Sequence, residues 1–336
     1  MLHYREDCKS VAWVSLYFLL TGLSWNTERL TGIAIIVVSY FSFACACITH
    51  NTMHTPVFTD RRLESVWRSA LSLTYGHPVS TFVPGHNISH HKFTQTTKDA
   101  MRTTKLRYTQ NWLNLVMFQP TVALDVFRMD VRYGLLMRHL RDPYFQTCVR
   151  EWALLLTSQV ALILLHPAKF FWLVYLPHIF AQTAIVSMNF LQHDGTDDSM
   201  ASINSSRNFV GPVINFFTFN NGLHTIHHLK PKLHWSRLPA QHAALVASQC
   251  HPALNQRCMA RYMFRAFVYP GTRVDYQGQP VRLPKLEEDT DWTLLYAPEG
   301  VQREEYDVGL QGLLCGGALG ALKVLCPVYS PVFKVD

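Results

Sequence analysis

The stretch LTGIAIIVVSYFSFACACITHNTMH, residues 30–54, joins a membrane signal to a metal-binding signal. Its first twenty residues carry no charge, and about 20 apolar residues in a helix are enough to cross a bilayer. His50 and His54 follow directly and are four residues apart, so a continuing helix places both imidazoles on one face. The sequence therefore predicts a transmembrane helix that ends in two candidate metal ligands.

Three further clusters carry residues of the same kind. They read HNISHH at residues 86–91, NFLQH at 189–193 and HTIHH at 224–228. A spacing of three to five residues brings side chains to one helix face, and an adjacent histidine pair can reach two metal ions. We therefore predict that a metal site is built from nine histidines: His50, His54, His86, His90, His91, His193, His224, His227 and His228. His234 follows the last cluster closely and is a further candidate.

The number of histidines points to two metal ions. Imidazole binds zinc, copper, iron and nickel, so the ligand type alone does not identify the metal. A catalytic zinc ion needs only three protein ligands, and two irons with four or five imidazoles each would account for all nine. Soluble di-iron carboxylate bundles use Glu and Glu-x-x-His motifs instead, and this sequence contains no Glu-x-x-His motif.

Four apolar stretches predict membrane passes, at about residues 11–25, 30–49, 150–166 and 170–192. Hydrophobic residues make up 49% of the 336-residue chain and charged residues only 16%. Short turns link the first two stretches and the last two. The predicted fold is an all-α integral membrane protein, with four transmembrane helices in two hairpins and a cytoplasmic helical cap that carries a histidine-rich di-metal site.

The distribution of charge predicts the orientation in the membrane. Residues 50–148 contain twelve Lys and Arg, whereas the two short turns contain only Arg29 and Lys169. Positive charge is retained on the cytoplasmic side, so both termini and all nine histidines are expected there. The net charge is +7, and the basic residues lie beside apolar segments. This arrangement favours contact with a lipid bilayer and argues against binding of nucleic acid. Eight cysteines without a CxxC pair exclude a zinc ribbon and argue against a disulfide framework.

Other segments are apolar enough to form interfacial or core helices, at residues 63–75, 112–126 and 208–219. Residues 309–326 are apolar and predict either a docked tail helix or a fifth membrane-associated segment. We divide the chain into a membrane domain, residues 1–249, and a C-terminal extension, residues 250–336, which is cytoplasmic or membrane-associated and whose role the sequence does not reveal.

Together, the motifs resemble those of the membrane fatty acid desaturase superfamily, in which HxxxH, HxxHH or HxxxHH, and a final HxxHH follow paired membrane helices. The resemblance runs from about residue 11 to residue 242. In the acyl-CoA desaturases of that family, an Asn-x-x-x-His on the fourth membrane helix supplies a histidine and a water-linked asparagine. The resemblance therefore adds Asn189 to the metal site. The middle cluster departs from the acyl-CoA desaturases, because three residues separate His86 from His90 where they have two.

The resemblance also implies the chemistry. Two Fe ions would use O2 as co-substrate, and the electrons would come from a separate donor such as ferredoxin, rubredoxin or cytochrome b5. The substrate would be a fatty acyl chain that is free or linked to CoA, a carrier or a lipid. Desaturation is the leading hypothesis; hydroxylation, acetylenic-bond formation and alkene-forming decarboxylation are alternatives. A membrane zinc hydrolase or a metal-binding transport protein would represent a different class.

Charged residues near the clusters have two interpretations each. Four carboxylates can orient imidazoles or simply be solvated in loops: Asp60, Asp194, Asp197 and Asp198. Four basic residues can meet an acidic head group, carrier or electron donor, or can reflect the ordinary excess of cytoplasmic positive charge: Lys98, Arg102, Lys105 and Arg107.

Overall fold

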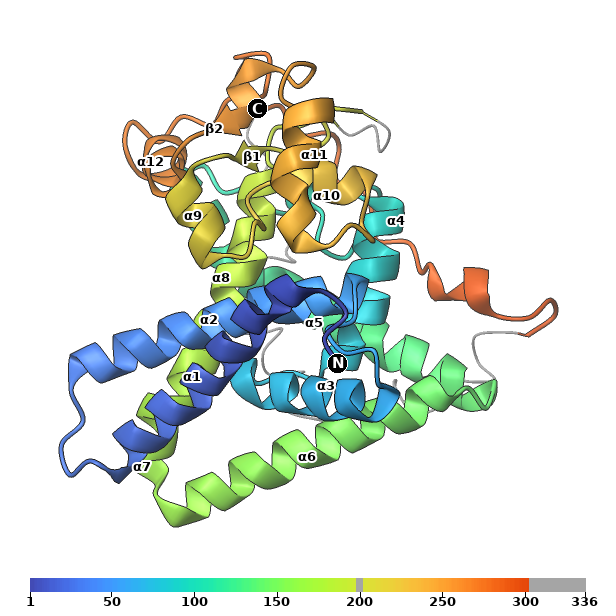
Figure 1. The fold of residues 1–336 in the computed structure, drawn as a ribbon. Helices are drawn as coiled ribbons and strands as arrows, with labels where there is room; N and C mark the ends of the chain where they lie inside the picture. The colour runs from blue at the N-terminus through green and yellow to red at the C-terminus, as the bar shows by residue number, and fades with distance from the viewer. Residues whose placement is uncertain (198–201, 302–336) are drawn as a thin grey trace.

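The computed structural model of the protein describes residues 1–197 and 202–301. A body of long helices lies beneath a cap of short elements (Figure 1). The long helices are α1 (Cys8–Asn26), α2 (Gly32–His54), α3 (Arg61–Tyr75), α5 (Asn111–His139), α6 (Pro143–Leu165) and α8 (Leu176–His193). The short ones are α4 (His91–Phe93), α7 (Pro167–Phe170), α9 (Pro212–Phe217), α10 (His224–Leu229), α11 (Leu238–Leu245) and α12 (Met259–Met263). Two short parallel strands, β1 (Asn208–Phe209) and β2 (Asn255–Gln256), lie in the cap.

Within the described residues, three helical segments are long and apolar enough to cross a membrane: Gly32–His54, Pro143–Leu165 and Pro167–His193. They overlap almost all of the predicted stretches 30–49, 150–166 and 170–192. The first predicted stretch also forms a helix, α1, but α1 is not one of the three. Lys9, three serines and other polar residues lower its mean hydropathy. A fourth membrane pass therefore stays a prediction.

The two short turns lie side by side at the end of the body remote from the cap. Lys169 in α7, just after the turn that follows α6, donates from Nζ to the carbonyls of Trp25 and Thr27, at 2.6 and 3.1 Å. From this end α2 and α8 pack against each other and run toward the cap (Figure 1). Their last residues, His54 and His193, therefore reach the same end of the molecule.

Helix α3 is fixed at both ends by its local sequence. The Asp60 carboxylate accepts hydrogen bonds from the amides of Arg62 and Leu63, both at 2.9 Å, and so caps the helix N-terminus. At the other end Gly76 has a φ of 74°, and a Cβ there would lie 2.5 Å from Nδ1 of His178. This glycine allows α3 to pack closely against α8. Asp60 thus acts as a helix cap and orients no imidazole.

Predictions for the remaining segments had mixed outcomes. The stretches 63–75 and 112–126 are helical and lie within α3 and α5. The stretch 208–219 was wrongly predicted as one helix, because Pro212 starts α9 only after the strand β1. The predicted segment 309–326 lies outside the described residues.

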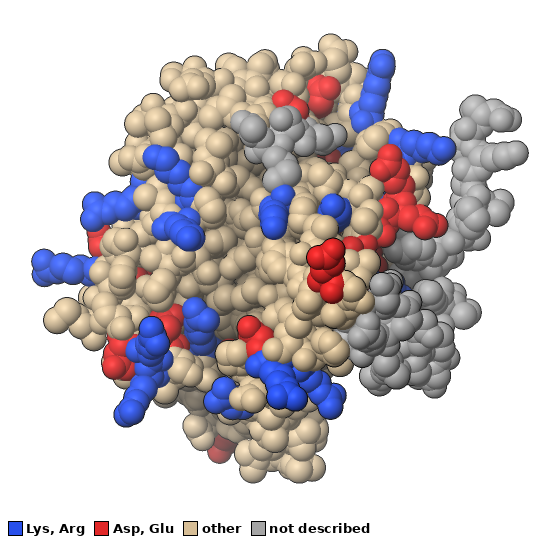
Figure 2. Space-filling view, turned by 90° about the vertical axis from the view of Figure 1, so that its right-hand side faces the viewer, with Lys and Arg blue, Asp and Glu red and all other residues tan. Residues whose placement is uncertain are grey.

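The described part of the C-terminal extension packs against the rest of the chain. Strand β2 pairs with β1, and Trp292 is fully buried beside Met129 and Tyr133 of α5. Asp289 forms ion pairs with Arg102 at 2.9 Å and with Lys105 at 2.6 Å. Arg102 and Lys105 therefore form ion pairs within the protein. The face in Figure 2 carries both Lys and Arg and Asp and Glu, with several basic side chains close together along its lower edge.

Candidate metal centre

The structure brings all nine histidines into two compact groups where the end of the helical body meets the cap. Group 1 consists of His50, His54, His86, His91 and His227, and group 2 of His90, His193, His224 and His228. Within each group, one nitrogen from every imidazole lies within 4.8 Å of the others. Adjacent histidines divide between the groups, as in the pairs 90–91 and 227–228. Two neighbouring sites therefore share the same short helical segments.

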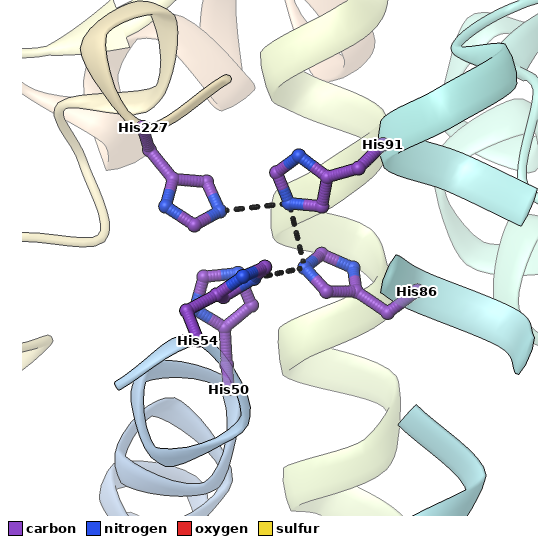
Figure 3. Close-up of side chains that lie close together, drawn as sticks. All are labelled: His50, His54, His86, His91 and His227. Carbon is purple, nitrogen blue, oxygen red and sulfur yellow. Dashed lines mark hydrogen bonds between the residues drawn. The ribbon is translucent and has the colours of Figure 1, made fainter. Parts of the chain in front are cut away.

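In group 1 the rings come from three parts of the fold and point toward one centre (Figure 3). His50 and His54 extend from the last two turns of α2, and His227 comes from α10 in the cap. His86 Nε2 lies 3.2 Å from Nε2 of His54 and 3.0 Å from Nε2 of His91. His227 Nε2 lies 2.9 Å from Nε2 of His91. The five imidazoles thus enclose a space that can hold one ion.

Group 2 has the same character and lies beside the end of α8. His193 Nε2 lies 2.9 Å from Nε2 of His224 and 3.2 Å from Nε2 of His228. The His90 ring completes the group, with its centre 4.8 Å from that of His193. Because α8 ends at His193 and α10 begins at His224, two helix ends meet at this group.

The extra residue in the middle cluster is accommodated by a local change of helix type. Residues Val83–His90 form a π-helical turn, in which i→i+5 hydrogen bonds replace the usual i→i+4 pattern. A wider turn keeps residues five apart on one face, so His86 and His91 both reach group 1. The spacing that departs from the acyl-CoA desaturases therefore still directs His86 into the site.

The chemistry of both groups suits metal cations. The His90 Nε2 atom is buried and has no hydrogen-bond partner among the described residues. Burial holds the pKa values of five histidines well below their usual range, and neighbouring imidazoles lower them further: His86, His91, His224, His227 and His228. The neutral form is the one that binds metals. Buried, inward-facing nitrogens of neutral imidazoles fit two ions held by histidines.

Partners on the outer side of the rings orient them. The Asp99 carboxylate accepts from His90 Nδ1 at 3.1 Å, His193 Nδ1 donates to the Ser205 carbonyl at 3.1 Å, and His50 Nδ1 lies 3.1 Å from Oδ1 of Asn51. A hydrogen bond from Nδ1 leaves Nε2 free to bind a metal. Each of these three imidazoles is therefore fixed in the orientation that a ligand needs.

Asp99 is the carboxylate that sequence reasoning missed. It is fully buried, and the amides of Gln95 and Met101 donate to it at 2.9 and 2.8 Å. Burial by itself raises the pKa of this carboxyl, but the His90 imidazole and these hydrogen bonds hold it below its usual range. Asp99 belongs to no sequence motif. A turn of the chain, and not a helical spacing, brings it next to His90.

The predicted candidates near the clusters have other partners. Asp194 forms an ion pair with Arg273, which lies in the C-terminal extension. Asp197 donates from its amide to the Asn204 carbonyl, and Asp198 lies outside the described residues. His234 belongs to neither group: its Nε2 lies 3.1 Å from the Asp7 carboxylate and so links the chain's N-terminal segment to the cap.

Asn189 lies one helical turn before His193 and lines a cavity beside the two groups. Three of the nine histidines line the same cavity, from α2, the π-helical turn and α10: His50, His86 and His224. The amide nitrogen of Asn189 is buried and has no partner among the described residues. Away from the histidines, the wall includes apolar side chains of α5 and α8: Val122, Ala123, Val126, Phe127, Ile185 and Val186. The cavity thus connects the histidines to a largely apolar space.

Gly222 positions the last histidine cluster, and we expect its replacement to damage the centre. A Cβ at this position would lie 2.4 Å from the Phe209 carbonyl oxygen and 2.7 Å from Oδ1 of Asn215. Gly222→Ala must therefore shift the segment that leads into His224, and overpacking of this kind costs about 1–3 kcal/mol. Metal analysis and thermal unfolding of the purified variant should show less bound metal and a lower Tm. Gly278→Ala is a suitable glycine control, since nothing lies within 4 Å of its Cβ, although its φ of 81° adds strain.

Comparison with known proteins agrees with this geometry. No curated protein matches the chain significantly. The family model described as fatty acid desaturase matches residues 29–258, which is more than half of the chain and includes all four histidine clusters. The chain therefore belongs to the fatty acid desaturase family.

Proposed function

We propose that the protein is a membrane-bound, O2-dependent di-iron enzyme that introduces a double bond into a long fatty acyl chain. Family membership supports an oxidoreductase that acts on acyl chains. The observation that carries the proposal is the cavity, because an apolar space between α5 and α8 reaches His50, His86 and His224. An acyl chain in this space would present one of its carbons to the metal centre.

The chain's own residues bind and orient the reactants. The two histidine groups would hold two irons, with Asn189 close by, and the apolar wall would exclude water around the acyl chain. The irons would supply the oxidising power that an unactivated methylene requires. Overall, –CH2–CH2–, O2, two electrons and two protons give –CH=CH– and two molecules of water. A separate electron donor is therefore part of the proposal.

Product identification tests the reaction. We expect cells that express the protein and receive an isotopically labelled fatty acid to form a labelled acid with one new internal double bond. Mass spectrometry of the extracted lipids would locate that bond. A labelled hydroxy acid, an acetylenic acid or a terminal alkene, formed without internal unsaturation, would replace desaturation by the corresponding alternative reaction. Cells that express His227→Ala serve as the control for host enzymes.

Metal analysis tests the centre independently of turnover. We expect the purified full-length protein to contain about two iron ions per chain, since the described structure holds two groups of imidazoles. Elemental analysis by mass spectrometry would give the ratio of metal to protein. One zinc ion and no iron would contradict the di-iron proposal and favour the zinc-enzyme class.

The same arrangement suggests how the partners approach. The histidine groups lie where α2 and α8 reach the cap, and positive charge in residues 50–148 favours a cytoplasmic position for this end. We propose that the acyl chain enters from the bilayer and that the electron donor docks from the cytoplasm. Labelling of single cysteines in the α1–α2 turn and in the cap, in intact cells, would test this orientation.

A further inference from the structure

The cavity beside the metal centre has a polar region that the proposed reaction does not use. Tyr75 on α3 and Asp130 on α5 both line the cavity and are only 3% and 8% exposed. The Tyr75 hydroxyl and both carboxyl oxygens of Asp130 are buried without a hydrogen-bond partner among the described residues. A buried polar group without a partner costs about 1–3 kcal/mol. Two such side chains on one cavity wall therefore point to a ligand.

The backbone of Tyr75 lies well away from the histidine-bearing ends of α2 and α8. Gln182 on α8 donates from Nε2 to the Tyr75 carbonyl at 3.0 Å. His193 follows eleven residues later on that helix, which corresponds to about 16 Å at a rise of 1.5 Å per residue. Ser42 on α2, eight residues before the first histidine of that helix, donates to the Thr74 carbonyl at 2.7 Å. The backbone at Thr74 and Tyr75 is therefore level with the middle of α2, whereas the Asp130 carboxyl lies beside Gly85, the residue before His86.

The chemistry of this region favours an uncharged ligand. Burial raises the pKa of Asp130 and of Tyr75 well above their usual ranges, which favours the uncharged form of each group. A protonated carboxyl and a phenol each donate and accept a hydrogen bond. The other polar residues of the wall include Gln119, Gln182 and Thr81, which are also neutral. No Lys or Arg lines this cavity within the described residues, so a carboxylate or phosphate would find no countercharge.

We propose that Tyr75 and Asp130 bind an uncharged hydroxyl group on the substrate chain, so that the protein acts on a hydroxylated lipid. The inference rests on the proposed function, because it assigns the substrate class of the same cavity. The hydroxyl would donate to one of the two side chains and accept from the other. Anchored at this point, the lipid would present a carbon at a fixed number of bonds from its hydroxyl to the metal centre.

Binding measurements test this site without requiring turnover. Octadecanoic acid and a series of its monohydroxy derivatives would compete with a fluorescent acyl probe for the full-length protein in detergent micelles. We expect at least one hydroxy acid to bind about tenfold more tightly than octadecanoic acid, as one or two added hydrogen bonds allow. Tyr75→Phe and Asp130→Leu should each bring this ratio close to one. Asp130→Asn should keep part of it, since an amide also donates and accepts.

The control is Tyr175→Phe, which removes a hydroxyl from a ring that is 47% exposed on the helix segment leading into α8. The Tyr175→Phe variant should retain the full preference for the hydroxy acid over octadecanoic acid. Equal binding of all the acids by the unmodified protein, or a preference that survives both Tyr75→Phe and Asp130→Leu, would overturn the site. Stronger binding of an amino derivative would also overturn it, because the site would then be selecting a cation.

Failure of the two proposals would look different. Selective binding of a hydroxy acid without any oxidised product from it would refute the oxidase function and leave the hydroxyl site in place. Desaturation of octadecanoic acid without any preference for its hydroxy derivatives would refute the hydroxyl site alone.

Discussion

His90→Ala and His227→Ala should each abolish turnover, with activity reduced by about a thousandfold or more. The two residues contribute to different groups, His90 to group 2 and His227 to group 1. If two metal ions act together, loss of either one removes several kcal/mol of transition-state stabilisation, and each 1.36 kcal/mol corresponds to a factor of ten. Turnover would be measured as labelled product formed per amount of protein present in the membrane fraction.

The two variants should also differ from each other in a way that activity does not show. His90→Ala should weaken metal binding mainly in group 2, and His227→Ala mainly in group 1. We expect each purified variant to retain close to one metal ion per chain, with distinct spectroscopic signatures for the remaining ion. Loss of both ions in both variants would mean that the groups form one cooperative site.

The matched control is His251→Ala. His251 is exposed and belongs to neither group, and its ring packs against that of Tyr276, with the ring centres 5.8 Å apart. Its replacement should leave turnover and metal content close to those of the unmodified protein. Full activity of His90→Ala or His227→Ala, or loss of activity in His251→Ala, would contradict the assignment of ligands.

The convergence of the histidines was predictable because two strong rules act together. Hydrophobic segments such as 30–49 and 170–192 require helices of limited length. Histidines that directly follow two such helices, as His50 and His193 do, must emerge at the same end if both helices cross the membrane in the same direction. The spacing within each cluster then fixes a helix face. None of these steps depends on details of side-chain packing.

Other features depend on packing and left no signal in the sequence. The π-helical turn at Val83–His90 differs from an α-helix by one residue per turn, and its composition does not reveal this. Asp99 reaches His90 through a turn whose path depends on tertiary contacts. Lys105 looked like an exposed charge of a cytoplasmic loop, yet it is held by Asp125 and by Asp289, which is distant in the sequence. Long-range partners of this kind cannot be read from local patterns.

The membrane prediction shows the same division. The stretches 30–49, 150–166 and 170–192 were recognised because apolar length with few charged residues is a local property. Whether α1 crosses the membrane is not decided by its own sequence. A helix with polar residues such as Lys9 can lie in the interface, or it can cross the bilayer if other parts of the protein cover its polar side. In the structure Lys9 Nζ lies 3.9 Å from the ring centre of Phe216 and 4.3 Å from that of Phe219. These aromatic contacts tie the start of α1 to the segment that precedes the last histidine cluster.

Asp99→Asn should lower the metal affinity of group 2 by about 10- to 100-fold, the effect typical of losing an outer partner of a ligating histidine. The amide is nearly the same size as the carboxylate, so the fold is expected to persist. However, the amide replaces one acceptor oxygen by an NH2 group, which is a donor. Both carboxylate oxygens of Asp99 accept hydrogen bonds, from His90, Gln95 and Met101. The His90 imidazole would lose its negatively charged partner and bind a metal cation less strongly.

Competition with a chelator of known affinity would measure this change, and Asp142→Asn provides the matched control. Asp142 is an exposed cap of α6 whose carboxylate accepts from the Tyr144 amide at 2.8 Å. Asn caps helices about as well as Asp, so the same chemical change there should leave metal affinity unaltered. Because His90 belongs to group 2 alone, the weakening in Asp99→Asn should be confined to one of the two ions. An equal effect on both ions, or none on either, would mean that the Asp99 carboxylate does not support His90 as a ligand.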